Sequence, residues 1–295
     1  MVKIVVIGSA SMDLTVLAKR RPNAGETIFG ERLILAPGGK GANQAVAAAR
    51  LGAEVHLVAC LGEDAYATEL MHNFAVNSVN CDYVVKLADQ STGSAHITLA
   101  EGDNSIIVIK GANDHVVPAI VDRAIAVIKA ADLVMLQQEI PAATVNYVVN
   151  LCHELNIPVL LNPAPILTPH PETLAKASFL TPNEHEVAEL FPDLELEQAL
   201  RAYPNKLIVT EGKLGALFCD GAQIKRVATF SVDALDTTGA GDTFNAAFAV
   251  AMAEGQGIEH SMRFANAAAA LSVTKLGAQG GMPERVAVER LLNHE

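Results

Sequence analysis

Short apolar runs alternate with longer amphipathic segments over most of the chain. The first run, residues 3–8, is rich in β-branched residues and ends in glycine, which predicts a buried strand. Further strands are predicted over residues 54–60, 133–136, 159–161 and 207–210. Helices are predicted over residues 43–51, 65–77, 121–130, 142–155, 184–190, 243–253 and 262–274. Buried strands separated by helices are typical of a mostly parallel sheet covered on both faces, so we expect a three-layer α/β/α sandwich.

Two stretches interrupt this alternation, residues 14–37 and 92–110. They contain strand-like pieces without long helices between them, and Glu101-Gly102-Asp103 is a hairpin turn signal between two such pieces. We therefore expect a small antiparallel β-sheet inserted on the main domain, beside the strand ends, where it could act as a lid. No repeat or linker divides the chain, so residues 1–295 are expected to form one domain.

Composition limits the possible partners. The formal net charge of −12 disfavours binding to nucleic acid or to an anionic membrane surface, so an anionic substrate would need a local positive site. Aromatic residues make up only 4% of the chain, so the core is expected to be aliphatic. The 4 cysteines and 9 histidines have no metal-binding spacing, and no apolar run is long enough for a signal peptide or a membrane span. Free thiols in a reducing cytoplasm are the expectation.

The strongest chemical motif spans residues 236–244, D-T-T-G-A-G-D-T-F, directly before a predicted helix. Glycines ahead of a helix allow backbone amides to converge on an anion, and the helix N-terminus adds partial positive charge. The amides of Gly239, Ala240 and Gly241 could then stabilise a transferred phosphoryl group, while Asp242 removes the proton of an attacking hydroxyl. If Asp242 only capped the helix, the G-x-G turn and the second carboxylate would be unexplained.

A second glycine-rich segment, residues 37–44 (P-G-G-K-G-A-N-Q), also precedes a predicted helix. Two glycines let the backbone approach a ligand closely, and Lys40 and Asn43 offer polar contacts, although a purely structural turn would read the same way. The chain contains no G-x-x-x-x-G-K-[ST] phosphate loop, and no G-x-G-x-x-G follows the first strand. The second absence argues against a dinucleotide-binding fold.

Taken together and in order, the motifs resemble the ribokinase family of carbohydrate kinases, within the phosphofructokinase-B-like superfamily. The matching segments run over essentially the whole chain: Gly8-Ser9-x-x-x-Asp13, Gly25-Glu26-Thr27, residues 38–45, Ser91-Thr92-Gly93, residues 162–165, Thr181-Pro182-Asn183-Glu184-x-Glu186, and residues 236–244 and 263–279. The resemblance implies a ribokinase-like kinase that uses ATP, Mg²⁺ and K⁺. It also implies a homodimer formed through the β lid.

The resemblance further implies a role for each matching residue, with Asp242 as the catalytic base. The sugar is expected to contact Ser11, Asp13, Gly38, Gly39, Lys40, Asn43 and Glu139, although Glu139 could instead be a solvated loop acid. The nucleotide is expected to contact Asn183, Thr210, Glu211, Gly212, Lys213, Leu214, Gly215, Gly241, Asp242 and Asn266. Glu186 is expected to order Mg²⁺ through water. A potassium loop is expected to involve Asp236, Thr238, Ser272, Lys275, Gly277 and Gly281, largely through backbone carbonyls.

The activity that the resemblance implies is ATP-dependent phosphorylation of the primary hydroxyl of D-ribose, giving D-ribose 5-phosphate. The alternatives are 2-deoxyribose, another furanose-like sugar or a nucleoside as substrate, and a sugar-sensing regulator without catalysis. A nucleoside kinase would need an apolar or aromatic platform for the base, and a chain with 4% aromatic residues has little material for one. The intact Asp242 and glycine turn argue against a regulator without catalysis. Two positions depart from the family pattern: Ser11 stands where ribokinases commonly carry Asn, and Gly281 where they often carry Ser.

Overall fold

The computed structural model, which describes residues 1–167 and 170–294, is built around a parallel sheet of six strands. The order is β10-β9-β8-β1-β4-β5, and each neighbouring pair is parallel. The strands are β1 (Lys3–Ile7), β4 (Glu54–Gly62), β5 (Asn80–Leu87), β8 (Leu133–Leu136), β9 (Val159–Leu161) and β10 (Phe179–Leu180). The expectation of a mostly parallel central sheet is confirmed.

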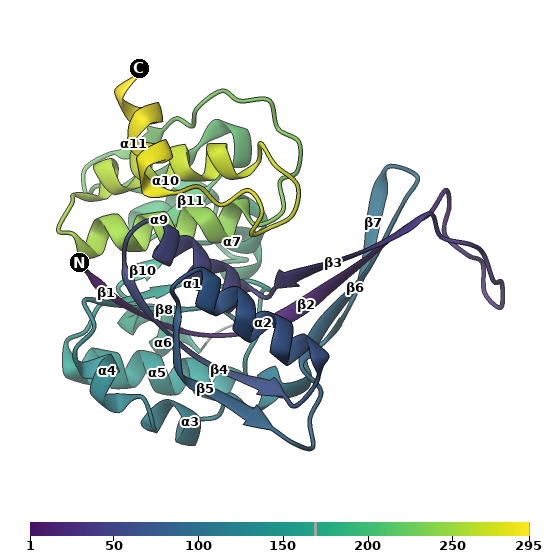
Figure 1. Cartoon of the computed structure of the whole chain (residues 1–295). Coiled ribbons are helices and arrows are strands. Elements are labelled where there is room, and N and C mark those ends of the chain that lie inside the picture. The colour runs from purple at the N-terminus through teal and green to yellow at the C-terminus, as the bar shows by residue number, and fades with distance from the viewer. Residues whose placement is uncertain (168–169, 295) are drawn as a thin grey trace.

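Helices cover both faces of this sheet (Figure 1). One layer holds α1 (Lys40–Arg50), α2 (Ala65–Val76), α9 (Ala240–Ala253), α10 (Ile258–Ser272) and α11 (Arg285–Asn293). The other holds α3 (Pro118–Asp122), α4 (Ile125–Lys129), α5 (Ala142–Leu155), α6 (Pro171–Lys176), α7 (Glu184–Leu190) and α8 (Leu196–Ala202). Successive residues of a strand face opposite sides, so Ile4 and Val6 join the first core and Val5 and Ile7 the second. The three-layer sandwich is therefore confirmed.

Elements β5, β10, α6, α8 and α11 were not predicted from the sequence, and two predicted elements differ in detail. The helix predicted over residues 121–130 is divided into α3 and α4, because the backbone N–H of Ala124 bonds to the Val121 carbonyl three residues back and breaks the α-helical register. The strand near residue 207, β11 (Ile208–Thr210), pairs antiparallel with β12 (Ala216–Cys219), which pairs with β13 (Ile224–Val227). The segment around this small sheet is joined to that of the central sheet by isolated bridges, such as Leu180 with Leu207.

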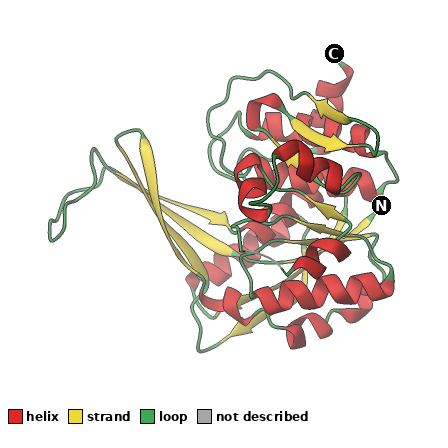
Figure 2. Ribbon diagram, turned by 180° about the vertical axis from the view of Figure 1, so that it is seen from behind, coloured by secondary structure: helices red, strands yellow, loops and turns green. Residues whose placement is uncertain are grey.

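A second sheet projects from the body, as Figures 1 and 2 show from opposite sides. Its order is β3 (Arg32–Gly38), β2 (Ser11–Leu17), β6 (Gly93–Ala100) and β7 (Asp103–Ile109). The β2–β3 and β6–β7 pairs are antiparallel, whereas β2 and β6 run parallel. Glu101 and Gly102 both have positive φ, at 59° and 76°, which is the tight hairpin turn that the sequence predicts. We call this four-stranded unit the projecting sheet.

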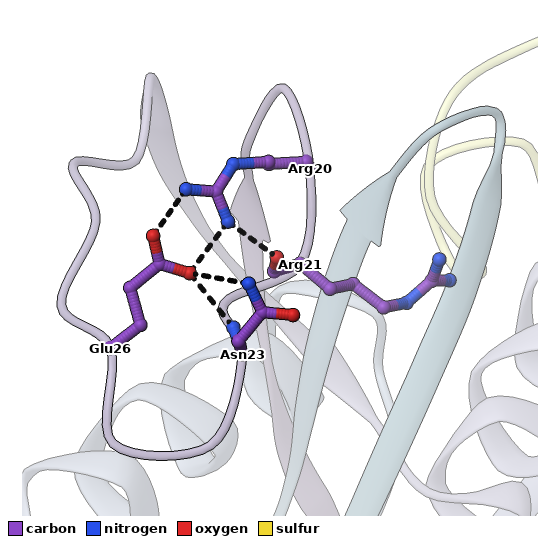
Figure 3. A network of polar contacts seen from close by, with 4 residues as sticks. All are labelled: Arg20, Arg21, Asn23 and Glu26. Atoms are coloured by element: carbon purple, nitrogen blue, oxygen red, sulfur yellow. Dashed lines mark hydrogen bonds and ion pairs between the residues drawn. The ribbon is translucent and has the colours of Figure 1, made fainter.

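The long loop between β2 and β3 is folded back on itself by Glu26 (Figure 3). Its Oε2 accepts hydrogen bonds from Arg20 Nη1 at 2.7 Å and from the backbone N–H of Asn23 at 2.9 Å. Arg21 points the other way, and its Nε donates to Ser105 Oγ at 3.2 Å on β7. The Gly25-Glu26-Thr27 match therefore lies in a loop that Glu26 closes locally, at the far end of the projecting sheet.

The cysteines Cys60, Cys81, Cys152 and Cys219 are free thiols. Burial raises the pKa of the Cys152 thiol to about 12, so this group is unreactive at neutral pH. No helix within residues 1–167 and 170–294 is long and apolar enough to span a membrane.

Candidate active site

Helices α1 and α9 pack against each other and both begin at a glycine. Gly39 has a φ of 88° and Gly239 a φ of 77°, values that favour glycine. A Cβ atom on Gly39 would lie 2.9 Å from Ala10 Cα, and one on Gly239 would lie 2.9 Å from Ala278 Cα. Because the residue before each helix is glycine, it offers no side-chain cap, and the first amides of each helix depend on other groups.

Asp242 lies in the first turn of α9 and is only 6% exposed. Its Oδ2 accepts a hydrogen bond from Asn43 Nδ2 at 2.9 Å, and its Oδ1 accepts one from Gln44 Nε2 at 3.0 Å. Both donors come from the first turns of α1. The two glycine-rich motifs of the sequence are thus joined through one carboxylate.

The proposed anion-binding amides are only partly available. The backbone N–H of Ala240 donates to the Thr237 carbonyl at 3.2 Å, so the expectation that Ala240 contributes a free amide is not supported. The turn geometry that starts α9 causes this bond. Gly241 is exposed, and no heavy atom lies within 4 Å of the position its Cβ would take. A ligand can therefore approach the Gly241 backbone closely, with the Gly239 amide on the preceding turn.

Glu139 follows β8 and lies at the start of α1. Its Oε2 accepts hydrogen bonds from the backbone N–H of Lys40 at 2.9 Å and from Ser9 Oγ at 2.5 Å, and Ser9 Oγ in turn accepts from the Gly41 amide at 3.2 Å. Glu139 is therefore a fixed group at a helix N-terminus, not a freely solvated acid. Its Oε1 is the oxygen left to face a ligand.

Ser11 and Asp13 lie on the same face of β2, two residues apart, where the projecting sheet leaves the body. Ser11 pairs with Gly38 at the end of β3 and with Gly93 at the start of β6. A Cβ atom on Gly38 would collide with the Asp13 carboxylate. Glycine at position 38 therefore gives the Asp13 side chain its space.

The charged groups of this region are tightly grouped. The pKa of Asp13 is raised to about 6, chiefly by burial and also by the negative charges of Glu139 and Asp242. Burial lowers the pKa of Lys40, but Asp242, Glu139 and Glu186 outweigh that effect and hold the pKa above its usual value. Lys40 thus remains a cation among carboxylates, and it supplies the local positive charge that an anionic substrate needs on a chain of net charge −12.

A cavity of about 590 Å³ opens beside the start of α9, a size that suits a nucleotide. Its lining includes seven of the residues that the family resemblance implies: Thr210, Gly212, Lys213, Gly215, Ala240, Gly241 and Asn266. Other lining residues were not anticipated from the sequence: Thr229, Phe230, Ser231, Val232, Ala234, Thr237, Phe244, Ala269, Ala270 and Val273. Half of these, between residues 229 and 234, lie in the loop after β13, where no local motif marks them. The others lie in the matching segments 236–244 and 263–279, which imply no nucleotide contact at these positions.

Three residues implied as nucleotide contacts have other partners or positions. Glu211 does not line the cavity, and it forms an ion pair with Arg226 at 2.5 Å. Leu214 is 53% exposed and also lies outside the lining. Asn266 lines the cavity, but its Nδ2 donates to the Val227 carbonyl at 2.8 Å, which leaves its Oδ1 for a ligand.

Asn183 and Glu186 form a capping box at the start of α7. Asn183 Oδ1 accepts from the Glu186 amide at 2.9 Å, and Glu186 Oε2 accepts from the Asn183 amide at 2.8 Å. Burial raises the pKa of Glu186, although the Asn183 amide and Lys40 oppose this. Among residues 1–167 and 170–294, no cluster of three His, Cys, Asp or Glu side chains could hold a metal ion. A single carboxylate fits Mg²⁺, which keeps most of its waters and binds chiefly substrate phosphates.

The segments of the expected potassium loop lie side by side. Asp236 Oδ1 accepts from the Thr238 amide at 2.9 Å, and its Oδ2 accepts from the Gly277 amide at 2.8 Å. Gly281 approaches the backbone of Ser272 so closely that a Cβ atom would lie 2.8 Å from the Ser272 carbonyl carbon. Glycine at position 281 is therefore required by this backbone contact. Backbone carbonyls of these segments would be suitable ligands for K⁺, and Lys275 lies in the same loop.

Comparisons with known proteins agree with this geometry. A family model described as pfkB family carbohydrate kinase matches residues 1–285. The chain is 54% identical over 290 residues to ribokinase of Bacillus subtilis, covering 98% of this chain and 99% of that protein. It is 37% identical over 292 residues to deoxyribokinase of Salmonella typhi, covering 95% of each. The structure of Arabidopsis thaliana ribokinase complexed with ribose and ATP superposes with a TM-score of 0.91 at 36% identity, covering 99% of each chain.

The family model and the curated relatives extend over nearly the whole of the chain, and the fold and the glycine-capped helix pair agree with them. The chain therefore belongs to the pfkB family of carbohydrate kinases.

Proposed function

We propose that this chain is an ATP-dependent ribose kinase, which transfers the terminal phosphoryl group of ATP to the primary hydroxyl of D-ribose and gives D-ribose 5-phosphate and ADP. The observation that carries the proposal is Asp242, a buried carboxylate held between two amides at an uncapped helix N-terminus. The names of the ribokinase relatives and of the ribose and ATP complex support the choice of substrates.

In this proposal, the sugar lies between the N-terminal end of β2 and the start of α1. Asp13 and Glu139 accept hydrogen bonds from sugar hydroxyls, and Lys40 and the backbone of Gly38 and Gly39 complete the site. Asn43 contributes less than the family resemblance implies, because Gln279 Nε2 donates to its Oδ1 at 2.9 Å and its Nδ2 is bonded to Asp242. Only one N–H of Asn43 is left for the sugar.

Asp242 accepts the proton of the primary hydroxyl as that oxygen attacks the terminal phosphorus. The Gly239 and Gly241 amides and the α9 N-terminus stabilise the negative charge that develops on the transferred group. The nucleotide occupies the 590 Å³ cavity. Asn183 does not line this cavity, and it would reach the phosphates from the start of α7. Mg²⁺, ordered through water by Glu186, would neutralise phosphate charge, and K⁺ held by the loops at Asp236 and Gly277 would fix the amides before α9.

We further propose that the projecting sheet closes over the sugar and that two such sheets pair in a homodimer. All residues of β7 are exposed, and Ile107 is 70% exposed and Val108 60%. Such an apolar surface needs a partner. The free thiols fit a reducing cytoplasm.

A second candidate substrate, 2-deoxyribose, is favoured by Ser11 and by the 37% identity to a deoxyribokinase. The test is ADP production with ribose, 2-deoxyribose, fructose, adenosine and pseudouridine at equal concentrations. The largest kcat/KM with ribose supports the proposal. A larger value with 2-deoxyribose or a nucleoside replaces it, and no turnover with any substrate favours a non-catalytic sugar sensor.

A further inference from the structure

The orientation of the two amides that hold Asp242 is fixed by chemistry. An ionised carboxylate only accepts hydrogen bonds, so Asn43 and Gln44 must turn their NH₂ groups toward Asp242 and their oxygens away from it. The second N–H of Gln44 Nε2 donates to Asn162 Oδ1 at 3.2 Å. Gln44 is fully buried, so its outward oxygen also needs a donor.

Two further glutamines supply the donors for these outward oxygens. Gln137 Nε2 donates to Gln44 Oε1 at 2.6 Å, and Gln279 Nε2 donates to Asn43 Oδ1 at 2.9 Å. Two chains of hydrogen bonds, which we call relays, therefore converge on Asp242. The first runs through Gln137 and Gln44, and the second through Gln279 and Asn43. An amide that turned over would present its NH₂ group to the outer glutamine, which could accommodate it only by turning over as well, and its oxygen to Asp242, which could not.

The side chain of Gln137 contains a buried oxygen that destabilises the fold, which indicates that the residue has a functional role. Its side chain is fully buried at the end of β8, yet its Oε1 has no hydrogen-bond partner among the described residues. A buried polar atom without a partner destabilises a protein, and a methionine of similar volume would carry no such atom. Gly8 makes room for this side chain, because a Cβ there would lie 3.3 Å from Gln137 Cδ and nearer still to its Oε1.

We propose that Gln137 and Gln279 are positioning residues for phosphoryl transfer, which act through Gln44 and Asn43 to keep hydrogen-bond donors aimed at both oxygens of Asp242. This inference rests on the proposed role of Asp242 as the base. Gln279 also lies in the loop after α10, where Gly277 bonds to Asp236, and Asn73 Nδ2 donates to its Oε1 at 2.7 Å. The second relay thus connects the catalytic carboxylate to the expected potassium loop.

Other charged groups face Asp242 from the surrounding elements and stay in place in the variants used here. Asp13 on β2, Lys40 on α1 and Glu186 on α7 interact electrostatically with Asp242, and Glu139 after β8 acts on Asp13 and Lys40. A change in the pH profile that follows loss of one relay therefore reports the hydrogen bonds to Asp242.

The test compares Gln137→Met and Gln279→Met with the control Gln138→Met. Gln138 is the neighbouring residue, 3% exposed, and its amide bonds the Leu167 backbone at 2.7 and 3.0 Å, away from Asp242. For Gln137→Met we expect kcat to fall about tenfold, the cost of one misdirected hydrogen bond to a carboxylate, with KM values for ribose and ATP within about twofold. We expect the acid limb of kcat to move about one pH unit upward, because an acceptor facing Asp242 favours its protonated form.

Stability separates positioning from a structural role. Gln137→Met removes one unpaired buried oxygen but leaves Gln44 Oε1 without its donor, so its Tm should stay close to that of the parent, whereas Gln138→Met should have a lower Tm and the parental kcat. A kcat of Gln137→Met within twofold of the parent with an unmoved acid limb overturns the inference. The inference is also overturned if kcat of Gln137→Met falls only together with its Tm, because a general loss of folding then explains the loss of activity.

The variant Asp242→Asn distinguishes failure of this inference from failure of the proposed function. If Asp242→Asn keeps the parental rate, Asp242 is not the base and the proposed function is wrong at that residue. If Asp242→Asn loses activity while both glutamine variants keep it, only the positioning role is wrong. Adding Gln137→Met to Asp242→Asn should lower kcat no further, and a further tenfold loss would show that Gln137 does not act through Asp242.

Discussion

The carboxylate of Asp236 accepts a hydrogen bond from the backbone N–H of Gly277 at 2.8 Å, across 41 residues of sequence. This contact ties the turn before α9 to the loop after α10. Burial raises the pKa of Asp236, but hydrogen bonds from Thr238 and Gly277 outweigh it and lower the pKa, so the group stays ionised. An ionised carboxylate attracts a cation, and the same turn leads directly into the amides at Gly239 and Gly241.

Potassium should therefore activate the enzyme without taking part in the reaction. We expect higher kcat with K⁺ than with tetramethylammonium at equal ionic strength, because the ion orders the turn before α9. Asp236→Ala should reduce that ratio several-fold, whereas Asp233→Ala, at an exposed site three residues earlier, should preserve it. Equal rates of the parent with both cations would contradict the prediction.

Ribose binding should weaken in mild acid because of Asp13, whose pKa burial raises to about 6. The carboxylate accepts two sugar O–H bonds only when ionised, so the KM for ribose should rise about tenfold between pH 7 and pH 5. The stability of the ligand-free protein should change with pH in the opposite direction. The folded state keeps a proton that the unfolded chain has lost, so its stability falls as the pH rises from about 4 to about 6.

The variant Asp13→Asn provides the control for this pH dependence. It should bind ribose more weakly at pH 7 but show a flat KM over the same range, with the KM for ATP unchanged. A parental KM for ribose that is constant from pH 5 to pH 7 would show that Asp13 does not contact the sugar as an anion.

Much of the fold could be predicted because its signals are local. Short segments carry each of these signals: the β-branched run at β1, the alanine-rich α1, and the glycines before α1 and α9. Each pattern predicts one kind of local structure. The Glu101-Gly102 turn was equally local. The split into α3 and α4 was missed, because apolar periodicity cannot detect a change to three-residue hydrogen bonding within a helical run.

The polar partners of the site could not be predicted in the same way. Gln44 and Gln137 are 93 residues apart, and Asn43 and Gln279 are 236 apart, so no spacing in the sequence connects them. Ser9 was visible in a motif, but its bond to Glu139 depends on the packing of β1 beside β8. The bond of the Ala240 amide to Thr237 arises from the turn that begins α9, which the glycine pattern alone does not determine.

Disrupting the apolar surface of the projecting sheet should separate the proposed dimer. Ile107→Lys places a charge on an exposed position of β7, so we expect a monomer by light scattering with the parental Tm. Val76→Lys is a matched control, because Val76 on α2 is also 70% exposed but lies on the body. An Ile107→Lys protein with the parental mass would exclude this part of the sheet from the interface.

Replacing the proposed base should abolish most of the turnover while binding persists. Asp242→Asn removes the proton acceptor, and loss of a general base costs about 10²–10⁴ in rate. Its NH₂ group would face either Asn43 or Gln44, one of which must turn over, so a small loss of Tm should accompany the change. Calorimetry should give Kd values for ribose and ATP close to those of the parent. A rate within a few-fold of the parent would remove Asp242 from the role of base.

The last prediction concerns how strictly the site recognises the sugar at Ser11. This side chain lies two residues before Asp13 on the same face of β2 and is only 9% exposed. A site built to hydrogen-bond a hydroxyl rejects an analogue that lacks it, because buried groups are then left unpaired. When the sugar lacks its 2-hydroxyl, a single rotatable hydroxyl at position 11 loses less binding free energy than the amide common in ribokinases would. The difference is about 1 kcal/mol, or several-fold in kcat/KM. We therefore expect ribose to be preferred, with 2-deoxyribose as a measurable substrate, and Ser11→Asn to increase the preference several-fold. Thr15→Asn, further along the same face of β2, should leave the ratio of the two kcat/KM values unchanged. An unchanged ratio in Ser11→Asn would show that Ser11 does not contact the 2-position, and a parent without activity on ribose would overturn the assignment of ribose itself.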